Sequence, residues 1–294
     1  MSPRPPSSLR SAWVAAMPGV FVVLWSSGYV FGKLGLPYAG PATFLTLRFC
    51  IVVAVMLPVA LIMRADWPRT PTAAGHVVVS GLLVQATYLG SVFAALQFGV
   101  PAGLAALIVG IQPLLTAALV GPMLGERVTP RQWLGFVLGL VGVALVVEHK
   151  LSFAGAELVG FVFCLVALAA ITLGTIYQKK FGGGQDLRST SVIQFAASAV
   201  AMGAVALAFE DLHVEWTVEF AVALGWLCVV LSIGAITLLF LLIRQGAAGK
   251  VASLFYLVPP VTALMAWPLF GETLGPVGVL GMAVAAVGVA LVNR

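Results

Sequence analysis

The sequence contains few charged residues. Only 9% of its 294 residues are Asp, Glu, Lys or Arg, whereas 61% are hydrophobic and the mean hydropathy is +1.11. Soluble domains carry about 25% charged residues, and a chain of this length folded in water would need polar side chains over a large surface. The composition therefore excludes a soluble enzyme, a nucleic-acid-binding protein and a disordered chain. It predicts that lipid surrounds most of the molecule.

Clusters of metal ligands or redox-active thiols are also missing. The three cysteines, Cys50, Cys164 and Cys228, lie inside apolar runs, and the sequence has no CxxC motif or Cys/His cluster. Such a pattern gives no framework for disulfides or for a metal site. We therefore expect neither a metal nor another cofactor.

Acidic residues are missing from the interior of the long apolar runs. An intramembrane enzyme would need an acid cluster, a set of metal ligands or a nucleophile beside a base. Proton-driven carriers commonly place a titratable acid in the transport path. The absence therefore argues against an enzyme, weakens the case for proton coupling and favours movement down the substrate gradient.

The apolar runs are long enough to cross a bilayer, for which a helix needs about 20 residues. Lipid admits only helices and closed barrels, and the runs lack the period-2 alternation of barrel strands. The predicted fold is therefore an all-α polytopic membrane protein whose short connections leave no room for a soluble domain. Ten transmembrane helices are expected near residues 13–32, 41–63, 73–97, 101–123, 131–147, 157–178, 189–209, 217–243, 249–270 and 276–292.

Lys and Arg are distributed unevenly over the two sides of these helices. With the N-terminus placed in the cytoplasm, 12 of the 15 Lys and Arg residues fall inside, Lys33 and Lys150 fall outside, and Arg48 lies within the second span. Positive residues concentrate on the cytoplasmic side of membrane proteins. We therefore expect cytoplasmic N- and C-termini, with residues 1–12 as a retained tail rather than a cleaved signal peptide.

The sequence also repeats itself. Residues 113–146 and 259–292, which are 146 positions apart, are identical at 15 of 34 positions, including rare Pro and Glu residues. The shift covers five spans, an odd number, so the two copies would cross the membrane in opposite directions. Inverted repeats are characteristic of secondary transporters, whose substrate site lies near the midplane between the halves. The expected halves are residues 1–150 and 151–294, with five helices each around a central cavity.

Several motifs stand out along the chain: Pro113, Gly125–Glu126, Gly135 and Gly142, their counterparts Pro259, Gly271–Glu272, Gly281 and Gly288, then Leu47–Arg48–Phe49 and Trp25–Ser26–Ser27–Gly28–Tyr29. These motifs resemble those of the EamA family of the drug/metabolite transporter superfamily over essentially the whole chain. The resemblance implies export of amino acids and other small metabolites by a basket of ten helices. Spans 1, 3, 4, 6, 8 and 9 would line the cavity, and spans 5 and 10 would pack peripherally. The opening segment is most similar to bacterial exporters of amino acids, including aromatic ones, which implies a bacterial inner (plasma) membrane.

A cavity for amino acids would combine polar groups for the charged ends with an apolar or aromatic wall for the side chain. Trp25 and Tyr29 share one face of the first span at i, i+4 spacing, and Gln85 and Tyr88 share one face of the third at i, i+3 spacing. This mixture favours aromatic and large apolar amino acids without strict selectivity. The predicted substrate contacts are these four residues, with Gln112, Tyr177, Ser253 and Tyr256 as additions.

Two cations allow alternative interpretations. Arg48 lies within the second span, where an unpaired charge is costly. It would either bind a substrate carboxylate or act as a structural bracket that bonds helix-end carbonyls, and its place in a motif shared across many substrates favours the bracket. Lys33 would be either a cationic part of the cavity wall or an interfacial residue. Phosphate-bearing substrates would need several cavity cations and are therefore disfavoured.

Pro113 and Pro259 lie near the middle of spans 4 and 9. Each removes a backbone donor and frees a carbonyl, which would either line the cavity or simply accompany a kink that a moving helix uses. Glu126 and Glu272 lie at membrane edges. We expect them to accept the first amides of spans 5 and 10, with a direct gating role as the alternative.

The predicted function is a secondary transporter that exports amino acids by alternating access, by facilitated diffusion. The alternative on the same fold is a multidrug or other-metabolite efflux carrier that is proton-coupled. A channel fits inverted repeats and proline-kinked helices less well. The expected partners are the lipid bilayer and a small-molecule substrate, without nucleic acid, and the chain is expected to be a monomer.

Overall fold

The structure is a computed structural model that describes residues 7–116, 119, 129–150, 155–235, 238, 254–273 and 275–292. The regular secondary structure in these ranges is helical, and pairing of extended backbone is limited to one antiparallel bridge between Ala39 and Val214. The all-helical fold predicted from the sequence is confirmed for this part of the chain.

Helices lie in each of the ranges where the sequence predicts a span. Four helical segments of the described chain have the length and apolarity to cross a bilayer: Pro41–Ile62, Pro71–Gln97, Ala156–Phe181 and Leu187–Phe209. In chain order the elements are α1 (Ser7–Gly35), α2 (Pro41–Ile62), α3 (Pro71–Gly81), η1 (Leu82–Thr87), α4 (Tyr88–Gln97), α5 (Ala102–Gly110), α7 (Pro130–Lys150), α8 (Ala156–Phe181), α9 (Leu187–Phe209), α10 (Val218–Gly225), η2 (Trp226–Ala235), η4 (Phe255–Leu257), α13 (Val258–Phe270) and α14 (Pro276–Val292).

Local sequence signals set the ends of these helices. The side chains of Thr70, Asp186 and Thr217 accept hydrogen bonds from backbone amides in the first turns of α3, α9 and α10. Such N-caps satisfy amides that have no partner within the helix. Gly271 ends α13 in the left-handed conformation, with φ of 67°, which glycine adopts without steric penalty. The helices can therefore end sharply, and the connections stay short.

A carboxylate joins α2 to the end of α9. Glu210 follows α9 and accepts hydrogen bonds from the amides of Ala42 and Thr43, both at 2.8 Å, and from the Thr43 hydroxyl at 2.7 Å. A Cβ on Gly40 would overlap this carboxylate, so the close approach requires glycine. The first turn of α2 is thus capped by a residue distant in the sequence.

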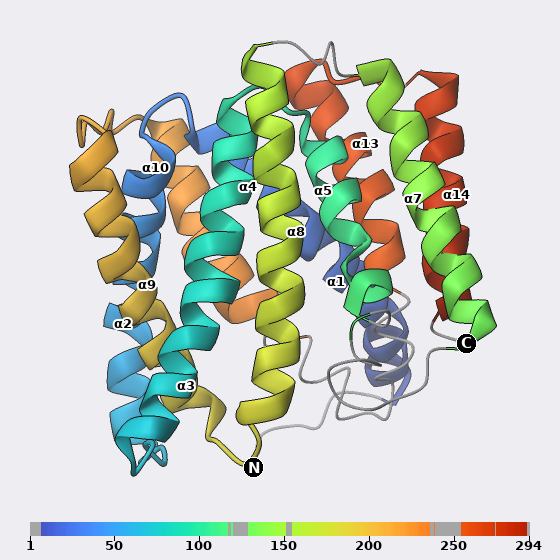
Figure 1. The fold of residues 1–294 in the computed structure, drawn as a ribbon. Coiled ribbons are helices and arrows are strands. Elements are labelled where there is room, and N and C mark those ends of the chain that lie inside the picture. The colour runs from blue at the N-terminus through green and yellow to red at the C-terminus, as the bar shows by residue number, and fades with distance from the viewer. Residues whose placement is uncertain are drawn as a thin grey trace.

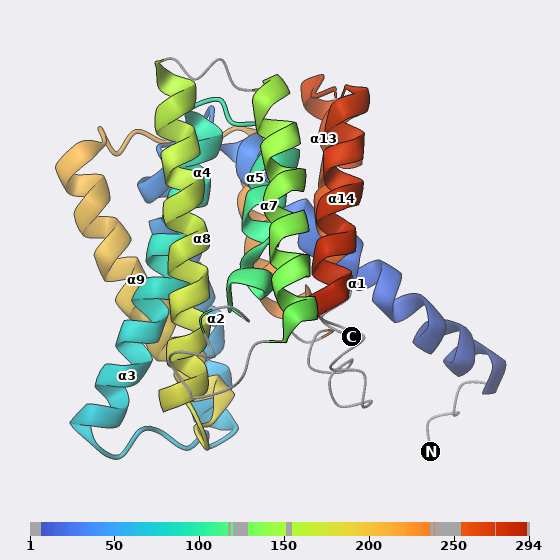
Figure 2. The same cartoon turned by 45° about the vertical axis from the view of Figure 1, so that its right-hand side comes forward.

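Two pairs of helices that the internal repeat relates also pack against each other. α2 lies along α9 and α7 along α14, and the second pair forms one edge of the bundle (Figures 1 and 2). α5 lies along α13, which belongs to the span that the repeat places on the span of α5. A Cβ on Gly142 would lie 2.5 Å from the carbonyl oxygen of Gly281, and a Cβ on Gly288 would lie 2.6 Å from that of Gly135. The shift of 146 residues exchanges these two contacts. The peripheral place of α7 and α14 agrees with the expectation for spans 5 and 10.

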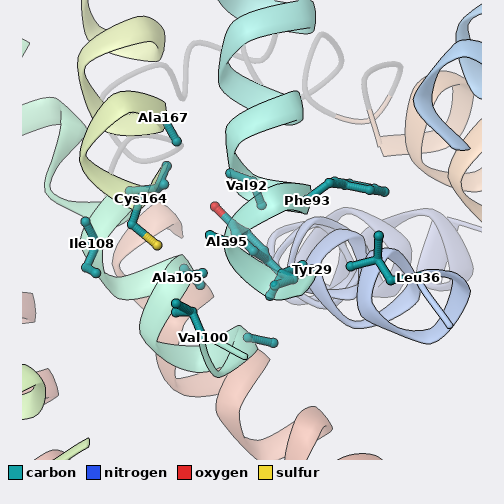
Figure 3. Close-up of a cluster of buried hydrophobic side chains, with 14 of the residues drawn as sticks. Tyr29, Leu36, Val92, Phe93, Ala95, Val100, Ala105, Ile108, Cys164 and Ala167 are labelled. Carbon is teal, nitrogen blue, oxygen red and sulfur yellow. The ribbon is translucent and has the colours of Figure 1, made fainter. Parts of the chain in front are cut away.

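The buried core lies where α1, α4, α5 and α8 meet. Figure 3 shows Tyr29 of α1 beside Val92 and Ala95 of α4, with Cys164 of α8 nearby. These side chains are each less than a tenth exposed. The core therefore fixes the first helix, which carries two of the predicted substrate contacts, against three other helices.

The outward faces of the helices carry large apolar side chains. Val200, Leu207 and Phe209 of α9 are 75%, 72% and 84% exposed. Soluble proteins rarely expose large contiguous apolar patches, so these faces agree with a lipid surrounding.

Candidate functional site

A cavity of about 170 Å³ lies between α1, α2, η1, α4, α8, α9 and η2. One water molecule needs about 10–15 Å³ on the same measure, so the cavity has room for a small organic molecule. Its wall is mainly apolar, with a few converging polar groups. The aromatic side chains of the wall are Trp25, Tyr29, Tyr88, Phe93 and Phe195, and the other polar side chains are Arg48, Gln85 and Ser232.

The cavity brings together residues that the sequence selects from three different spans: Trp25, Tyr29, Arg48, Gln85 and Tyr88. Within the described chain its lining comes from spans 1, 2, 3, 6, 7 and 8, whereas the family resemblance implies spans 1, 3, 4, 6, 8 and 9. The difference arises because the packed pair α2 and α9 presents side chains to the cavity.

Two π-helical segments, η1 and η2, both contribute to the cavity wall. The shift of 146 residues places η1, residues 82–87, on residues 228–233 within η2. π-helical segments inside α-helices are frequent at functional sites, because the extra residue per turn redirects side chains. Gln85 of η1 and Ser232 of η2 reach the cavity in this way. Hydrophobic periodicity gave no sign of either segment, and Ser232 was therefore missed.

The polar groups of the cavity form two small sets. The hydroxyls of Tyr29 and Tyr88 lie 3.4 Å apart, and either can be the donor. Arg48 donates from Nη2 to the Ser232 hydroxyl at 3.3 Å, and Ser232 donates to the Leu227 carbonyl at 2.9 Å. The Arg48 side chain is buried, yet its Nε has no hydrogen-bond partner among the described residues. A guanidinium that lines the cavity thus has one buried donor without a partner among the described residues.

The repeat offers an internal comparison for Arg48. The same shift places Arg48 of α2 on Gln194 of α9, which donates to the Ser80 hydroxyl at 2.8 Å. Gln194 therefore links α9 to α3 without a charge, while Arg48 links α2 to η2 with one. Since a neutral side chain suffices for this kind of link, the bracket interpretation does not account for the positive charge of Arg48.

Neighbouring rings hold the aromatic wall in place. Trp25 packs edge-on against Phe255, with ring centroids 5.1 Å apart. Phe93 packs on Phe44 at 5.4 Å, and Phe195 packs on Phe49 at 5.6 Å. Aromatic pairs at such distances add about 0.5–1.5 kcal/mol beyond burial. The wall is therefore largely preformed. Phe93 and Phe195 have no feature that separates them in sequence from the other phenylalanines, and they were missed.

Two of the additional predicted contacts lie away from the cavity. Gln112 donates to the hydroxyls of Thr116 and Thr175, at 3.4 and 3.3 Å, and so links the segment after α5 to α8. The Tyr177 hydroxyl lies 2.7 Å from Nδ1 of His76, beside a separate pocket of about 20 Å³. Ser253 and the side chain of Tyr256 lie outside the described residues.

The two prolines differ in their surroundings. Pro113 follows a turn at Ile111, after the end of α5. Pro259 lies in the first turn of α13, directly after the 3-10 segment η4, so its missing amide costs no bond within α13. The carbonyl of Val258, just before Pro259, accepts a hydrogen bond from the Ser26 hydroxyl at 3.3 Å. It therefore joins α1 to α13.

Lys33 and Glu272 form an ion pair near the cavity. Lys33 Nζ lies 2.5 Å from Glu272 Oε1, and the side chains are 23% and 12% exposed. The Glu272 carboxylate also accepts from the Ala102 amide, with oxygen atoms at 3.0 and 3.1 Å. The predicted capping of a helix start is found, but the helix is α5 rather than span 10. The pair ties together α1, α5 and the α13–α14 connection. Glu126, its counterpart, lies outside the described residues.

Comparison with known proteins agrees with this architecture. A protein of Streptantibioticus cattleyicolor named "Probable terminal-alkyne amino-acid exporter" is 30% identical over 297 residues, covering 97% of this chain and 94% of the relative. An inner membrane transporter of Escherichia coli strain K12, YedA, is 26% identical and covers 92% and 87%. A solved crystal structure with 18% identity aligns with a TM-score of 0.68 over 94% of both chains, which shows the same fold.

The helical bundle, the apolar outer faces and the amphipathic central cavity agree with the architecture of a membrane transporter. The profile of the EamA-like transporter family matches residues 14–148 and, a second time, residues 158–294. The chain belongs to the EamA-like transporter family and is a bacterial membrane protein.

Proposed function

We propose that the protein is a secondary transporter that exports small carboxylate-bearing metabolites with an apolar body, including aromatic and large apolar amino acids. The single observation that carries this proposal is the buried Arg48 guanidinium in a described lining that is otherwise uncharged and rich in aromatic side chains. The guanidinium offers a carboxylate two parallel hydrogen bonds, and Trp25 and Tyr88 offer rings to the side chain. The name of the S. cattleyicolor relative, an amino-acid exporter, points the same way.

The internal repeat supports alternating access as the mechanism. The contacts of Gly142 with Gly281 and of Gly288 with Gly135 are exchanged by the repeat shift, as two antiparallel halves around a two-fold axis would require. Two such halves can rock about a central site so that it opens to one side and then to the other. The residue range 1–150 would be one half and 151–294 the other.

The orientation follows from the distribution of Lys and Arg. The start of α1 and the end of α14 lie toward the same end of the bundle (Figure 2), as an even number of crossings requires. With that end in the cytoplasm, the Lys33–Glu272 pair faces the outside of the inner membrane. Both termini are then cytoplasmic, and ten helices cross the membrane.

Counterflow in liposomes tests the proposed function. Purified protein is reconstituted into vesicles loaded with unlabelled phenylalanine, and uptake of labelled phenylalanine and of its N-acetyl derivative is followed without a pH gradient. A carrier accelerates entry when substrate is present on the opposite side, whereas a channel does not. If neither compound shows such trans-stimulation, the proposed function is wrong.

A further inference from the structure

The part of the cavity lining that the structure describes has one unbalanced positive charge. Arg48 is the only charged side chain among the described lining residues, and a guanidinium stays protonated in proteins. The eight acids whose side chains the structure describes lie elsewhere. Glu272 pairs with Lys33, Glu210 caps α2 and Asp186 binds Arg188. The others, which do not line the cavity, are Asp66, Glu157, Asp211, Glu215 and Glu219. The described lining therefore carries a charge of about +1 at neutral pH.

From this charge we propose that the cavity prefers monoanionic carboxylates without an ammonium group over zwitterionic amino acids, so that the membrane potential drives their export. This inference rests on the proposed function and ranks the proposed substrates by how well the cavity binds them. A cation removed from water is strongly unfavourable unless it is paired. A monoanion with an apolar body supplies the missing charge and fills the aromatic part of the cavity.

A zwitterion supplies the same carboxylate but adds an ammonium on the neighbouring carbon. Bound to Arg48, that ammonium would lie close to a like charge, and the described lining offers it no carboxylate. The neutral alternatives are the Gln85 carbonyl, the Tyr29 and Tyr88 hydroxyls, which lie 3.4 Å apart, and the ring faces. These groups make the zwitterion a weaker ligand than an N-acylated or amino-free carboxylate with the same side chain.

The charge of the substrate also determines the driving force. A cell interior that is electrically negative pushes an anion outward, and a potential of 100 mV, at 2.3 kcal/mol per charge, corresponds to a concentration ratio of about 50 for a monovalent anion. A zwitterion moves no net charge and gains nothing from the potential. A transporter for monoanions therefore needs no titratable acid in its path, in accord with the lack of one in the described lining.

The test compares three compounds with the same ring: N-acetylphenylalanine, an anion; phenylalanine, a zwitterion; and phenylalaninamide, a cation. Their uptake into vesicles is measured with a potassium diffusion potential of either sign set by valinomycin, and protein-free vesicles correct for leakage. We expect uptake of the anion to be at least tenfold faster than uptake of phenylalanine. An inside-positive potential should accumulate it about tenfold per 59 mV, while phenylalanine uptake stays unchanged.

Substitutions of Arg48 test whether its positive charge causes the preference for the anion. Arg48→Gln introduces the residue found at the repeat-related position, Gln194. It should reduce uptake of N-acetylphenylalanine at least tenfold and abolish the preference for this anion over phenylalanine. Arg48→Lys keeps the charge and should retain the preference. Arg69→Gln, in an exposed connection, makes the same chemical change away from the cavity and serves as the matched control. Gel filtration and thermal unfolding establish that each variant is folded.

Three outcomes distinguish this inference from the proposed function. Preference for the anion, lost in folded Arg48→Gln and coupled to the potential, supports the inference. Counterflow of phenylalanine that equals or exceeds that of the anion, without response to the potential, overturns the inference and leaves the proposed function standing. Absence of counterflow with both carboxylates overturns both.

Discussion

The ion pair between Lys33 and Glu272 should hold one end of the cavity closed. Lys33 is one helical turn from Tyr29 on α1, while Glu272 follows α13 and also accepts from the Ala102 amide at the start of α5. Opening at this end requires α1 to separate from α5 and α13, and the pair must then break. We therefore expect Glu272→Gln to favour the state that is open at this end.

The size of the effect follows from the burial of the pair. Hydrogen bonds to charged groups contribute about 1.5–3 kcal/mol, and the exposure of Lys33, at 23%, favours the lower limit. Glutamine keeps an acceptor for the Ala102 amide, so the loss is mainly the charge interaction with Lys33. About 1.4 kcal/mol corresponds to a tenfold change in the ratio of the two states.

Thiol accessibility measures this ratio. Leu89→Cys places a thiol in the cavity wall, on a background in which Cys50, Cys164 and Cys228 are replaced by alanine. An impermeant maleimide applied from outside should react about tenfold faster when Glu272→Gln is added. Glu219→Gln, in the exposed first turn of α10, is the matched control and should leave the rate unchanged. An equal rate in folded Glu272→Gln and its parent would refute the closing role of the pair.

Three further substitution experiments test the cavity wall, the orientation in the membrane and the carboxylate of Asp186. Trp25→Ala and Gln85→Ala should each reduce counterflow by up to about tenfold through lost contacts with the cavity wall, while gel filtration shows that both variants are folded. Trp226 lies outside the described lining, so Trp226→Phe should keep the stacking on Phe31 and transport normally. A cysteine at the exposed Gly183 should resist impermeant thiol reagents in intact cells, because the proposed orientation places it in the cytoplasm, and ready labelling would contradict that orientation. Hydrogen bonds from Arg188 hold the pKa of Asp186 below its usual range, so the ionised carboxylate stabilises the fold above about pH 4, and this contribution disappears as the pH falls through the lowered pKa. Asp186→Asn should therefore make the thermal unfolding temperature depend less on pH in the acid range, and an unchanged pH profile would contradict this role.

Sequence reasoning located the helices and part of the site for a simple physical reason. Trp25 and Tyr29, or Gln85 and Tyr88, share a helix face whatever the neighbours are, because that relation depends on helical spacing alone. Which faces meet depends on packing between distant segments. Tyr177 was therefore assigned to the cavity although it pairs with His76.

Serine and phenylalanine illustrate the other limit of sequence reasoning. Ser232 and Phe195 occur in long apolar runs and resemble many neighbours that never reach the cavity. The π-helical turn of η2 places Ser232 in the cavity wall, and the packing of α2 against α9 places Phe195 there. Neither feature produces a hydrophobic period in the sequence, so both residues could be identified only from the arrangement of the helices.

The two halves share a scaffold but differ in chemistry at the cavity. The repeat shift places Trp25 on Ile171, Gln85 on Leu231 and Arg48 on Gln194.

At the first two of these position pairs, both members line the cavity, and the polar or aromatic member belongs to the first half. A substrate held by Arg48 would therefore lie with its carboxylate toward α2 and its apolar body in reach of Ile171 and Leu231. In the proposed alternating-access mechanism, similar backbones in the two halves would let the bundle open toward either side with similar packing. Because the side chains of the two halves differ, the same groups would bind the carboxylate and the apolar body in both states.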